Sequence, residues 1–386
     1  MVWVMKNQLL KMCINTVILL GCVGIVINFS PFLQSPASTI STFLLKSSHP
    51  QLFLEEYKEK TTTHNDSDTA NNTTTQSQQV ESVMNGIGVE DSKNDSSITT
   101  TPDDIVQLME DANASFDTAL ATGKTSEESY FGGGTLVTHD KVEVQSKIPE
   151  SFYQLDIGEL LKQGADLTIA DKTQPTILVY HSHATESYSL LDTGFYIDSD
   201  SRSDDTNRNM VRVGEELVRY LEKAGFVVLH DKTIHDTSYN SAYSSSKASV
   251  EKYLEEYPTI EITIDVHRDT ITYSDGTKVK PTAEINGKKA ARLMLIAGCE
   301  YGSVKNYPDW ENNLRFDLAV QHKMCEKYPQ LMRPILFSQR KYNMNLTHNS
   351  FLLEVGTDAN TLDEACYSAR LFGEALGELL NDEYVH

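Results

Sequence analysis

From about residue 150 onward, short runs of β-branched and aromatic residues alternate with stretches of helical periodicity. This alternation is typical of an α/β domain whose mostly parallel sheet is flanked by helices. The pattern predicts six strands, over Thr176 to Tyr180, Phe226 to Leu229, Ile260 to Val266, Arg292 to Ala297, Pro334 to Phe337 and Phe351 to Glu354.

Helices are expected between these strands. Two apolar helical faces lie over 211–221 and 362–380, and Gly225 follows the first as its C-terminal cap. The Asp-Gly pair at 275–276 and the Asn-Gly pair at 286–287 are hairpin turn signals. The sheet is therefore expected to carry an antiparallel addition in this region.

The amino-terminal end has a different pattern. Lys6 and Lys11 precede an uncharged run from Met12 to Leu45, and the first acidic residue is Glu55. About 20 apolar residues cross the roughly 30 Å hydrocarbon layer, and lysines before such a helix keep that end in the cytoplasm. We therefore expect a cytoplasmic start and a transmembrane signal-anchor within 1–45, with the rest extracytoplasmic in the cell membrane. The alternative is a cleaved signal peptide, since small residues occur at 35–38.

The stretch after this run is polar. No Phe, Trp or Tyr occurs from Lys58 to Ser115, where Thr, Ser, Asn, Gln and Asp are abundant. Such a segment buries too little apolar surface to offset its ordering entropy. We interpret residues 46–145 as a flexible tether that contains a short helix near Ile105 to Leu120, and residues 146–386 as the folded domain.

Charge and cysteine content narrow the function. The net charge of −22 argues against a nucleic acid partner. Among the five cysteines, Cys299, Cys325 and Cys366 follow the apolar run and lack metal-ligand spacing. We expect these three to pack as ordinary side chains.

Polar side chains follow three of the predicted strands. His181, His183 and Glu186 come after the first strand, His267 ends the third, and Glu354 ends the last. Ligands of open α/β sheets gather at the carboxyl ends of the strands. A single histidine at a strand end is more often a hydrogen-bonded structural group, but His181 and His183 are two positions apart and can face the same point.

These residue types fit a catalytic zinc site. Such a site has about three protein ligands and one open position. His183 and His267 supply two ligands, whereas Asp205, Glu186 and His181 are all candidates by type for the third. Glu354 is the expected general base, taking a proton from water and giving it to the leaving amine. Asp265 and Asp269 are either groups that orient His267 or solvated charges.

Four ordered segments then carry a family resemblance: YHSHATESY at 180–188, DVHRD at 265–269, NGKKAARLM at 286–294, and LEVG at 353–356 followed by NTL at 360–362. Together they resemble the stage II sporulation protein P family, which is related in fold to zinc-dependent N-acetylmuramoyl-L-alanine amidases. The resemblance covers roughly residues 150–386.

The resemblance implies a peptidoglycan hydrolase that cuts the amide between N-acetylmuramic acid and L-alanine of the stem peptide, and also peptide cross-links. It implies action in spore engulfment with stage II sporulation proteins D and M.

The resemblance also implies site residues. His183 and His267 match the amidase histidines, and Glu354 matches the catalytic glutamate. Asp205 stands four residues before Asn209, where the amidases have a glutamate ligand. His181 and Glu186 belong to family motifs that line the site, and Arg268 is expected to contact a substrate carboxylate or the developing oxyanion.

Two other classes remain open from the sequence. One is a metal-dependent amidohydrolase, in which a His-x-His pair also follows the first strand, although that fold needs eight β/α units. The other is a catalytically inert wall-binding scaffold.

Overall fold

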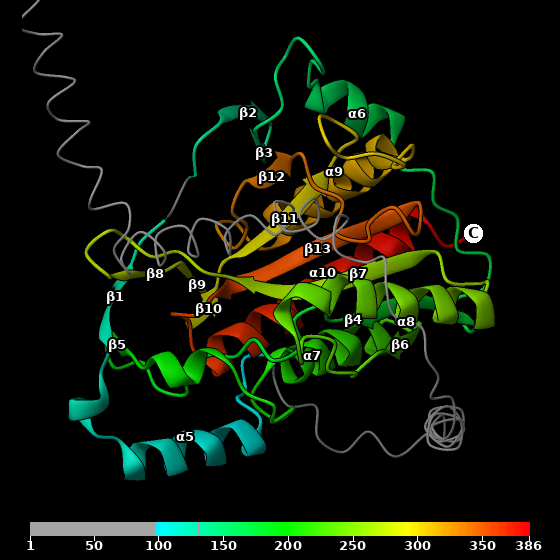
Figure 1. The fold of residues 1–386 in the computed structure, drawn as a ribbon. Coiled ribbons are helices and arrows are strands. Elements are labelled where there is room, and N and C mark those ends of the chain that lie inside the picture. The colour runs from blue at the N-terminus through cyan, green and yellow to red at the C-terminus, as the bar shows by residue number, and fades with distance from the viewer. Residues whose placement is uncertain (1–97, 130–131) are drawn as a thin grey trace, which may run out of the picture. The chain divides into compact units, whose positions relative to one another are not determined.

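A mixed eight-stranded sheet forms the centre of the folded unit in the computed structural model, which describes residues 98–129 and 132–386 (Figure 1). Its strands, in spatial order, are β2 (Thr135–His139), β3 (Val142–Ser146), β12 (Ile335–Ser338), β11 (Leu293–Gly298), β13 (Asn349–Thr357), β7 (Ile262–Asp269), β4 (Pro175–Tyr180) and β6 (Val227–His230). All six strands predicted from the sequence are present.

The direction of the strands divides the sheet. β6, β4, β7 and β13 are mutually parallel, and β11, β12 and β3 are parallel to one another. The two groups meet at the β11–β13 pair, which is antiparallel, and β2 is antiparallel to β3 at one edge. The sheet is thus mostly parallel, as predicted. The carboxyl ends of the first group of strands, however, lie at the opposite end of the sheet from those of the second group.

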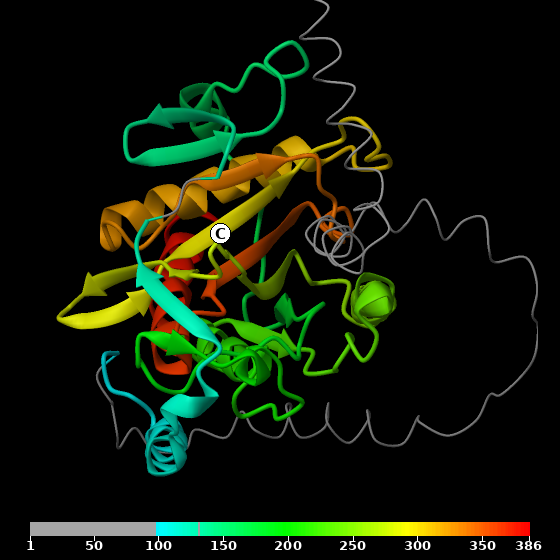
Figure 2. The same cartoon turned by 60° about the vertical axis from the view of Figure 1, so that its left-hand side comes forward.

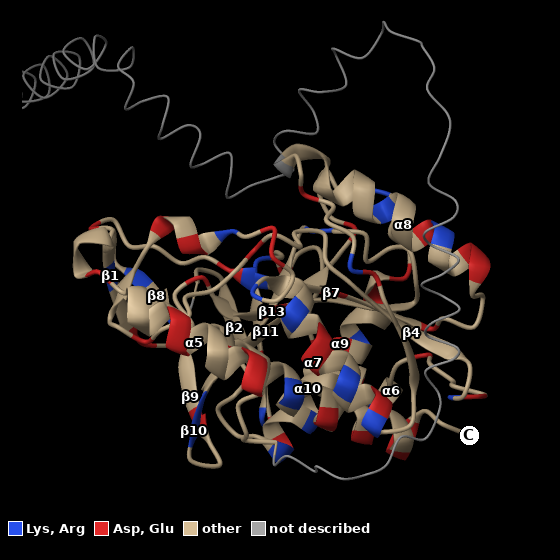
Figure 3. Cartoon of the chain, turned by 90° about the horizontal axis from the view of Figure 1, so that it is seen from below, with Lys and Arg blue, Asp and Glu red and all other residues tan. Residues whose placement is uncertain are grey.

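Helices cover both faces of the sheet. α7 (Met210–Lys223), α9 (Trp310–Lys327) and α10 (Leu362–Glu383) lie on one face, and α8 (Ala242–Glu256) lies on the other (Figure 3). The remaining helices are α5 (Asp103–Ser115), α6 (Ile157–Gln163) and the 3₁₀ turns η2 (Thr118–Leu120), η3 (Asp198–Ser201) and η4 (Tyr239–Ser241). The two predicted helices over 211–221 and 362–380 are α7 and α10, and Gly225 follows α7 with a φ of 92°.

The alternation of side chains along β7 shows which residues face the main core and which face α8. Ile262, Ile264 and Val266 are buried in the main core together with residues of α7 and α10. Successive side chains of a strand point to opposite faces. Asp265 and His267 therefore project from the face that α8 covers.

The Asn-Gly turn forms a hairpin, as predicted, but the hairpin is a two-stranded sheet of its own and not the expected addition to the central sheet. β9 (Thr282–Ile285) and β10 (Lys288–Ala291) pair antiparallel around Asn286 and Gly287, whose φ angles are 51° and 74°. Two consecutive positive φ angles are the geometry that this dipeptide favours. The hairpin extends away from the central sheet (Figure 2), and a separate small sheet contains β5 (Phe195–Tyr196), β1 (Gly123–Glu127) and β8 (Lys278–Lys280).

The folded unit begins earlier than the boundary near residue 145 that the sequence predicts. Residues 103–146 contain α5, β1, β2 and β3, and β3 pairs with β12 inside the main sheet. Val142 and Val144 are fully buried, so even this polar stretch contributes to the core. The predicted short helix is present as α5.

The predicted anchor, and the predicted tether up to residue 97, lie outside the described residues. In the part of the chain that the structure describes, no helix has the length and apolar character needed to span a bilayer.

The open sheet excludes the amidohydrolase alternative. An eight-unit β/α barrel is a closed sheet of parallel strands, whereas this sheet ends at β2 and β6 and contains antiparallel pairs. Cys299, Cys325 and Cys366 are free, as expected for ordinary packing.

Candidate functional site

The candidate site lies at the carboxyl ends of three adjacent strands. β4, β7 and β13 are neighbours and run parallel, so their carboxyl ends share one edge of the sheet. His183 follows β4, His267 lies near the end of β7, and Glu354 lies in β13. Glu354 and His267 are register partners. Since paired residues of parallel strands point to the same face, both side chains project toward α8.

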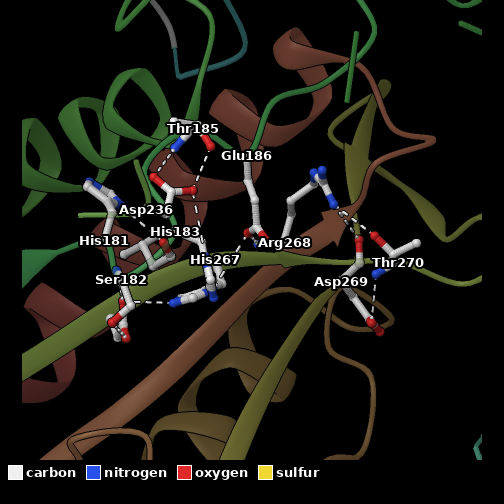
Figure 4. A network of polar contacts seen from close by, with 12 residues as sticks. His181, Ser182, His183, Thr185, Glu186, Asp236, His267, Arg268, Asp269 and Thr270 are labelled. Carbon is white, nitrogen blue, oxygen red and sulfur yellow. Dashed lines mark hydrogen bonds and ion pairs between the residues drawn. The ribbon is translucent and has the colours of Figure 1, made fainter. Parts of the chain in front are cut away.

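The imidazoles of His183 and His267 meet the carboxylate of Glu186 at this edge (Figure 4), and the carboxylate of Asp265 is in contact with His267. The ring centroids of His183 and His267 are 5.4 Å apart. Glu186 Oε2 lies 3.6 Å from His267 Nδ1, and Asp265 Oδ1 lies 2.9 Å from His267 Nε2. All four residues are more than nine-tenths buried.

A third carboxylate approaches the other histidine. Asp236 Oδ2 lies 3.7 Å from His183 Nδ1 and accepts a hydrogen bond from the Thr185 hydroxyl at 2.6 Å. Arg202 Nη1 donates to the same oxygen at 2.8 Å. At 3.7 Å, Asp236 faces His183 as an ion-pair partner for the protonated ring and is beyond hydrogen-bond distance.

The charges of the cluster stabilise one another. Burial by itself would raise the pKa of Glu186, but contact with His267 and the positive charge of Arg268 outweigh it and hold this pKa far below its usual range. Burial by itself would lower the pKa of His267, yet Asp265 and Glu186 raise it well above its ordinary value. In this arrangement Glu186 is ionised and available to bind a cation.

Glu354 is in a different environment. Its side chain is buried, and among the described residues its Oε2 has no hydrogen-bond partner. Burial, reinforced by the charge of Asp269, raises the pKa of Glu354 to about 8. A carboxyl group with a pKa near neutrality can both accept and return a proton, which general acid–base catalysis requires.

Arg268 has a structural role in the described contacts. Its Nε donates to the Ser187 carbonyl, its Nη2 to the Ser201 carbonyl and its Nη1 to the Thr270 hydroxyl. The side chain is buried, and these bonds occupy the guanidinium. The expectation that Arg268 contacts substrate is not matched by this geometry, which ties the segment after Glu186 to the end of β7.

Asp205 is not brought to the histidines. It is exposed, and its Oδ1 accepts hydrogen bonds from the backbone and side-chain nitrogens of Asn207 at 3.0 and 2.8 Å. Asn209, which completes the spacing, caps α7 by accepting from Val211 N. The Asp-x-x-x-Asn spacing therefore belongs to a surface turn at Asp205 and a helix cap at Asn209. Asp205 is not positioned as the third ligand of a zinc ion.

His181 is occupied elsewhere. Its Nδ1 lies 3.0 Å from the Val266 carbonyl, and its Nε2 lies 2.8 Å from His230 Nε2. Burial lowers the pKa of His181 to about 4 and that of His230 well below its ordinary value, so both rings are neutral. His181 positions the strand end that carries His183.

Two further residues, Asp236 and Tyr243, lie at the site without having been expected from the sequence. Asp236 follows β6, so applying the strand-end rule to this fourth parallel strand would have identified it. Tyr243, at the start of α8, stacks on His267 with ring centroids 6.2 Å apart and meets His183 edge-on at 5.4 Å. No sequence signal distinguishes Tyr243 from the other tyrosines.

The donor set at this edge has the chemistry of a zinc site, although its side chains are not arranged around an ion. Within residues 98–129 and 132–386, no group of three or more His, Cys, Asp or Glu side chains is disposed to hold a metal ion. Two imidazoles and one glutamate are nevertheless a known catalytic zinc ligand set. The 3.6 Å between Glu186 Oε2 and His267 Nδ1 is close to the separation of about 3.3 Å that two ligands of one tetrahedral zinc have.

The fold and the site define an α/β protein with a buried histidine–carboxylate cluster at the ends of parallel strands. The chain belongs to the stage II sporulation protein P family, whose model matches residues 39–377.

One curated relative is the Stage II sporulation protein P of Bacillus subtilis (strain 168), which is 27% identical over 274 residues. The match spans 65% of this chain and 65% of that protein.

Several solved structures are partly similar to the chain. An N-acetylmuramoyl-L-alanine amidase from Clostridium difficile 630 matches with 13% identity and a TM-score of 0.32, over 55% of this chain and 98% of the amidase. One from Mycobacterium abscessus has 10% identity and a TM-score of 0.33, over 54% and 98%. A metallo-carboxypeptidase from Burkholderia cenocepacia has 10% identity and a TM-score of 0.32, over 55% and 58%.

Proposed function

We propose that this chain is a zinc-dependent peptidoglycan hydrolase that cuts the amide between N-acetylmuramic acid and L-alanine of the stem peptide, and also peptide cross-links. The observation that carries the proposal is the cluster of His183, Glu186 and His267 beside the buried carboxyl of Glu354. Membership of the stage II sporulation protein P family supports it.

In this proposal His183, Glu186 and His267 hold the ion, with Glu186 in the place that the sequence assigned to Asp205. A bound zinc would polarise the carbonyl of the scissile amide and favour deprotonation of water. Asp265 and Asp236 lie 2.9 and 3.7 Å from the ring nitrogens of His267 and His183 that would face away from the ion, and would orient the two imidazoles from there.

Glu354 is the proton-transfer group. Its Oε2 takes a proton from the attacking water, and the same atom returns it to the amide nitrogen as the C–N bond breaks. Burial of Glu354 keeps bulk water from competing for this proton. Arg268 acts at a distance by holding the segment after Glu186 in place.

The cellular setting belongs to the same proposal. The predicted helix within 1–45 would anchor the chain in the cell membrane, with the hydrolase domain on the extracytoplasmic side. There it would act on the wall during engulfment, together with stage II sporulation proteins D and M.

Mass spectrometry of the products released from purified peptidoglycan by the full-length chain tests this function. We expect free stem peptides that begin with L-alanine, loss of release on chelation, and recovery on addition of zinc. Products cut only within the peptide would replace the amidase assignment with an endopeptidase one. If peptidoglycan stayed intact in the presence of zinc, the inert wall-binding scaffold would be the better description.

A further inference from the structure

A column of aromatic rings leads outward from the candidate site. Tyr243 is stacked on His267 with an interplanar angle of 8°, and Tyr342 is stacked on Tyr243 with centroids 4.9 Å apart and an angle of 16°. The guanidinium of Arg340 then lies over the ring of Tyr342, 5.3 Å from its centroid. Arg340, Tyr342 and Tyr243 are each only partly buried, so the column reaches the surface.

Arg340 differs from every other arginine of the chain. The sequence contains ten arginines, all within the described residues. Nine of them have a carboxylate, hydroxyl, amide or carbonyl partner for the guanidinium; these are Arg202, Arg208, Arg212, Arg219, Arg268, Arg292, Arg315, Arg333 and Arg370. In the described part of the chain, the Arg340 guanidinium has the ring of Tyr342 as its contact and no hydrogen-bond acceptor or carboxylate.

The backbone holds this arrangement in an unusual conformation. Tyr342 and Asn343 have φ angles of 40° and 62°, in the left-handed region that is costly for a tyrosine. The Asn343 side chain fixes the turn by donating to the Tyr243 carbonyl at 3.0 Å and to the Ser246 hydroxyl at 3.1 Å. Local backbone strain of this kind is concentrated at functional sites.

Among the residues that the structure describes, no carboxylate pairs with Arg340, although the chain is strongly acidic. Asp and Glu outnumber Lys and Arg by 55 to 33, and the net charge is −22. An anionic ligand is therefore repelled by the chain as a whole and depends on a local cation. A guanidinium binds a carboxylate through two parallel hydrogen bonds, and stacking on a ring preorganises it for this.

We propose that Arg340, stacked on Tyr342, is a subsite that binds a free carboxylate of the peptide substrate and so helps to select the substrate. From His267 to Tyr243, Tyr342 and Arg340 the successive centres are 6.2, 4.9 and 5.3 Å apart. The column is therefore at most as long as about five residues of extended peptide, at roughly 3.4 Å each. The carboxylate therefore lies within a stem peptide's length of the reacting amide. The substrate class rests on the proposed function, whereas the anion subsite is tested by binding alone.

Direct binding to the full-length chain carrying Glu354→Gln tests the subsite, because the peptide then stays uncleaved. The probes are fluorescent muramyl peptides, each amidated at one carboxylate, compared with the unmodified peptide. We expect that amidation of one particular carboxylate weakens binding about tenfold relative to the unmodified peptide. Adding Arg340→Gln should reduce this difference to less than twofold.

Two further variants make the test specific. Arg340→Lys keeps the charge but not the planar fork, so an intermediate preference is expected. It also preserves the test if the glutamine variant does not fold. Lys341→Gln is the matched control, because it removes the charge next to Arg340. The Lys341 Nζ donates to the Lys305 carbonyl, so this variant should retain most of the preference.

The proposal is overturned if every amidated peptide binds as tightly as the unmodified one, or if Arg340→Gln keeps the full preference. It is also overturned if Lys341→Gln abolishes the preference equally, since that would indicate a diffuse charge effect. If the parent chain hydrolyses no peptidoglycan while the Glu354→Gln chain shows the preference, the proposed function is rejected and the subsite stands.

Discussion

Glu354 and His267 are register partners on the adjacent parallel strands β13 and β7, and both side chains lie on the face of the sheet covered by α8. This relationship fixes a carboxyl group beside an imidazole without requiring either to be on a flexible loop. Sites built on regular strands are more precise than those built on loops. The position of the proposed general base is therefore determined by strand pairing.

Replacement of Glu354 by glutamine should slow hydrolysis strongly and leave the fold intact. Glutamine has the same shape but cannot accept the proton, and loss of such a group costs about 10²- to 10⁴-fold in rate. The measurement is kcat for release of stem peptides, with circular dichroism to check folding. Glu256→Gln, at an exposed position of α8, is the matched control. Activity retained by the Glu354 variant would reject its role.

Replacement of Glu186 and of Asp205 should separate the two candidates for the third zinc ligand. Because Glu186 lies 3.6 Å from His267 whereas Asp205 is occupied by Asn207, we expect Glu186→Gln to weaken zinc binding by more than about 100-fold. Asp205→Asn should leave affinity within about twofold. Competition with a chromogenic chelator measures both values. The opposite ranking would restore Asp205 as the ligand.

Replacement of Gly214 by alanine should destabilise the protein. A methyl group at this position of α7 would lie 2.6 Å from His181 Nε2 and 2.8 Å from His230 Nε2. Displacing this buried histidine pair should cost about 1–3 kcal/mol in the free energy of unfolding, which denaturant titration measures. Gly133→Ala meets no atom within 4 Å and serves as the control. Equal stability of the two variants would show that the pair readily moves.

Replacement of Asp317 by asparagine should remove a pH-dependent loss of stability. Both carboxylate oxygens of this buried residue of α9 lack a hydrogen-bond partner among the described residues, and burial raises the pKa of Asp317 well above its ordinary value. The unfolded chain ionises near pH 4, whereas the folded chain resists ionisation. Stability from this group is therefore complete below about pH 4 and falls by up to about 1.4 kcal/mol per unit as pH rises toward the folded pKa.

Denaturant titrations from pH 4 to pH 8 measure this effect. The difference in free energy of unfolding between the Asp317→Asn variant and the parent should shift in favour of the variant as pH rises. The exposed Asp204→Asn should follow the parent across the range. A constant difference between the Asp317 variant and the parent would show that the carboxyl does not titrate abnormally.

The strands could be predicted from the sequence because their signal is local. Thr176 to Tyr180 and Phe351 to Glu354 are short β-rich runs, and Asn286 with Gly287 specifies its turn through two positive φ angles. The antiparallel meeting of β11 and β13 could not be predicted, because strand direction depends on how distant segments pair. β2 and β3 were missed because their sequences are mostly polar.

The site could be predicted only in part. His183, His267 and Glu354 were singled out by their positions at strand ends, and the structure brings these strand ends together. The choice between Glu186 and Asp205 depended on spacing, and the same spacing serves a surface turn and a helix cap at Asp205 and Asn209. Asp236 follows β6 and could be found by the same strand-end rule, whereas Tyr243 reaches the site through tertiary packing, which no local pattern reports.

The hydrogen bonds of Arg268 to the carbonyls of Ser187 and Ser201 join the two ends of the segment between them. The segment is also held along its length, since β5 pairs with β1 and Asp192 pairs with the buried Lys280. Loss of the Arg268 side chain should therefore disturb two places at once, the residues next to Glu186 and the turn η3, and not a single point of the surface.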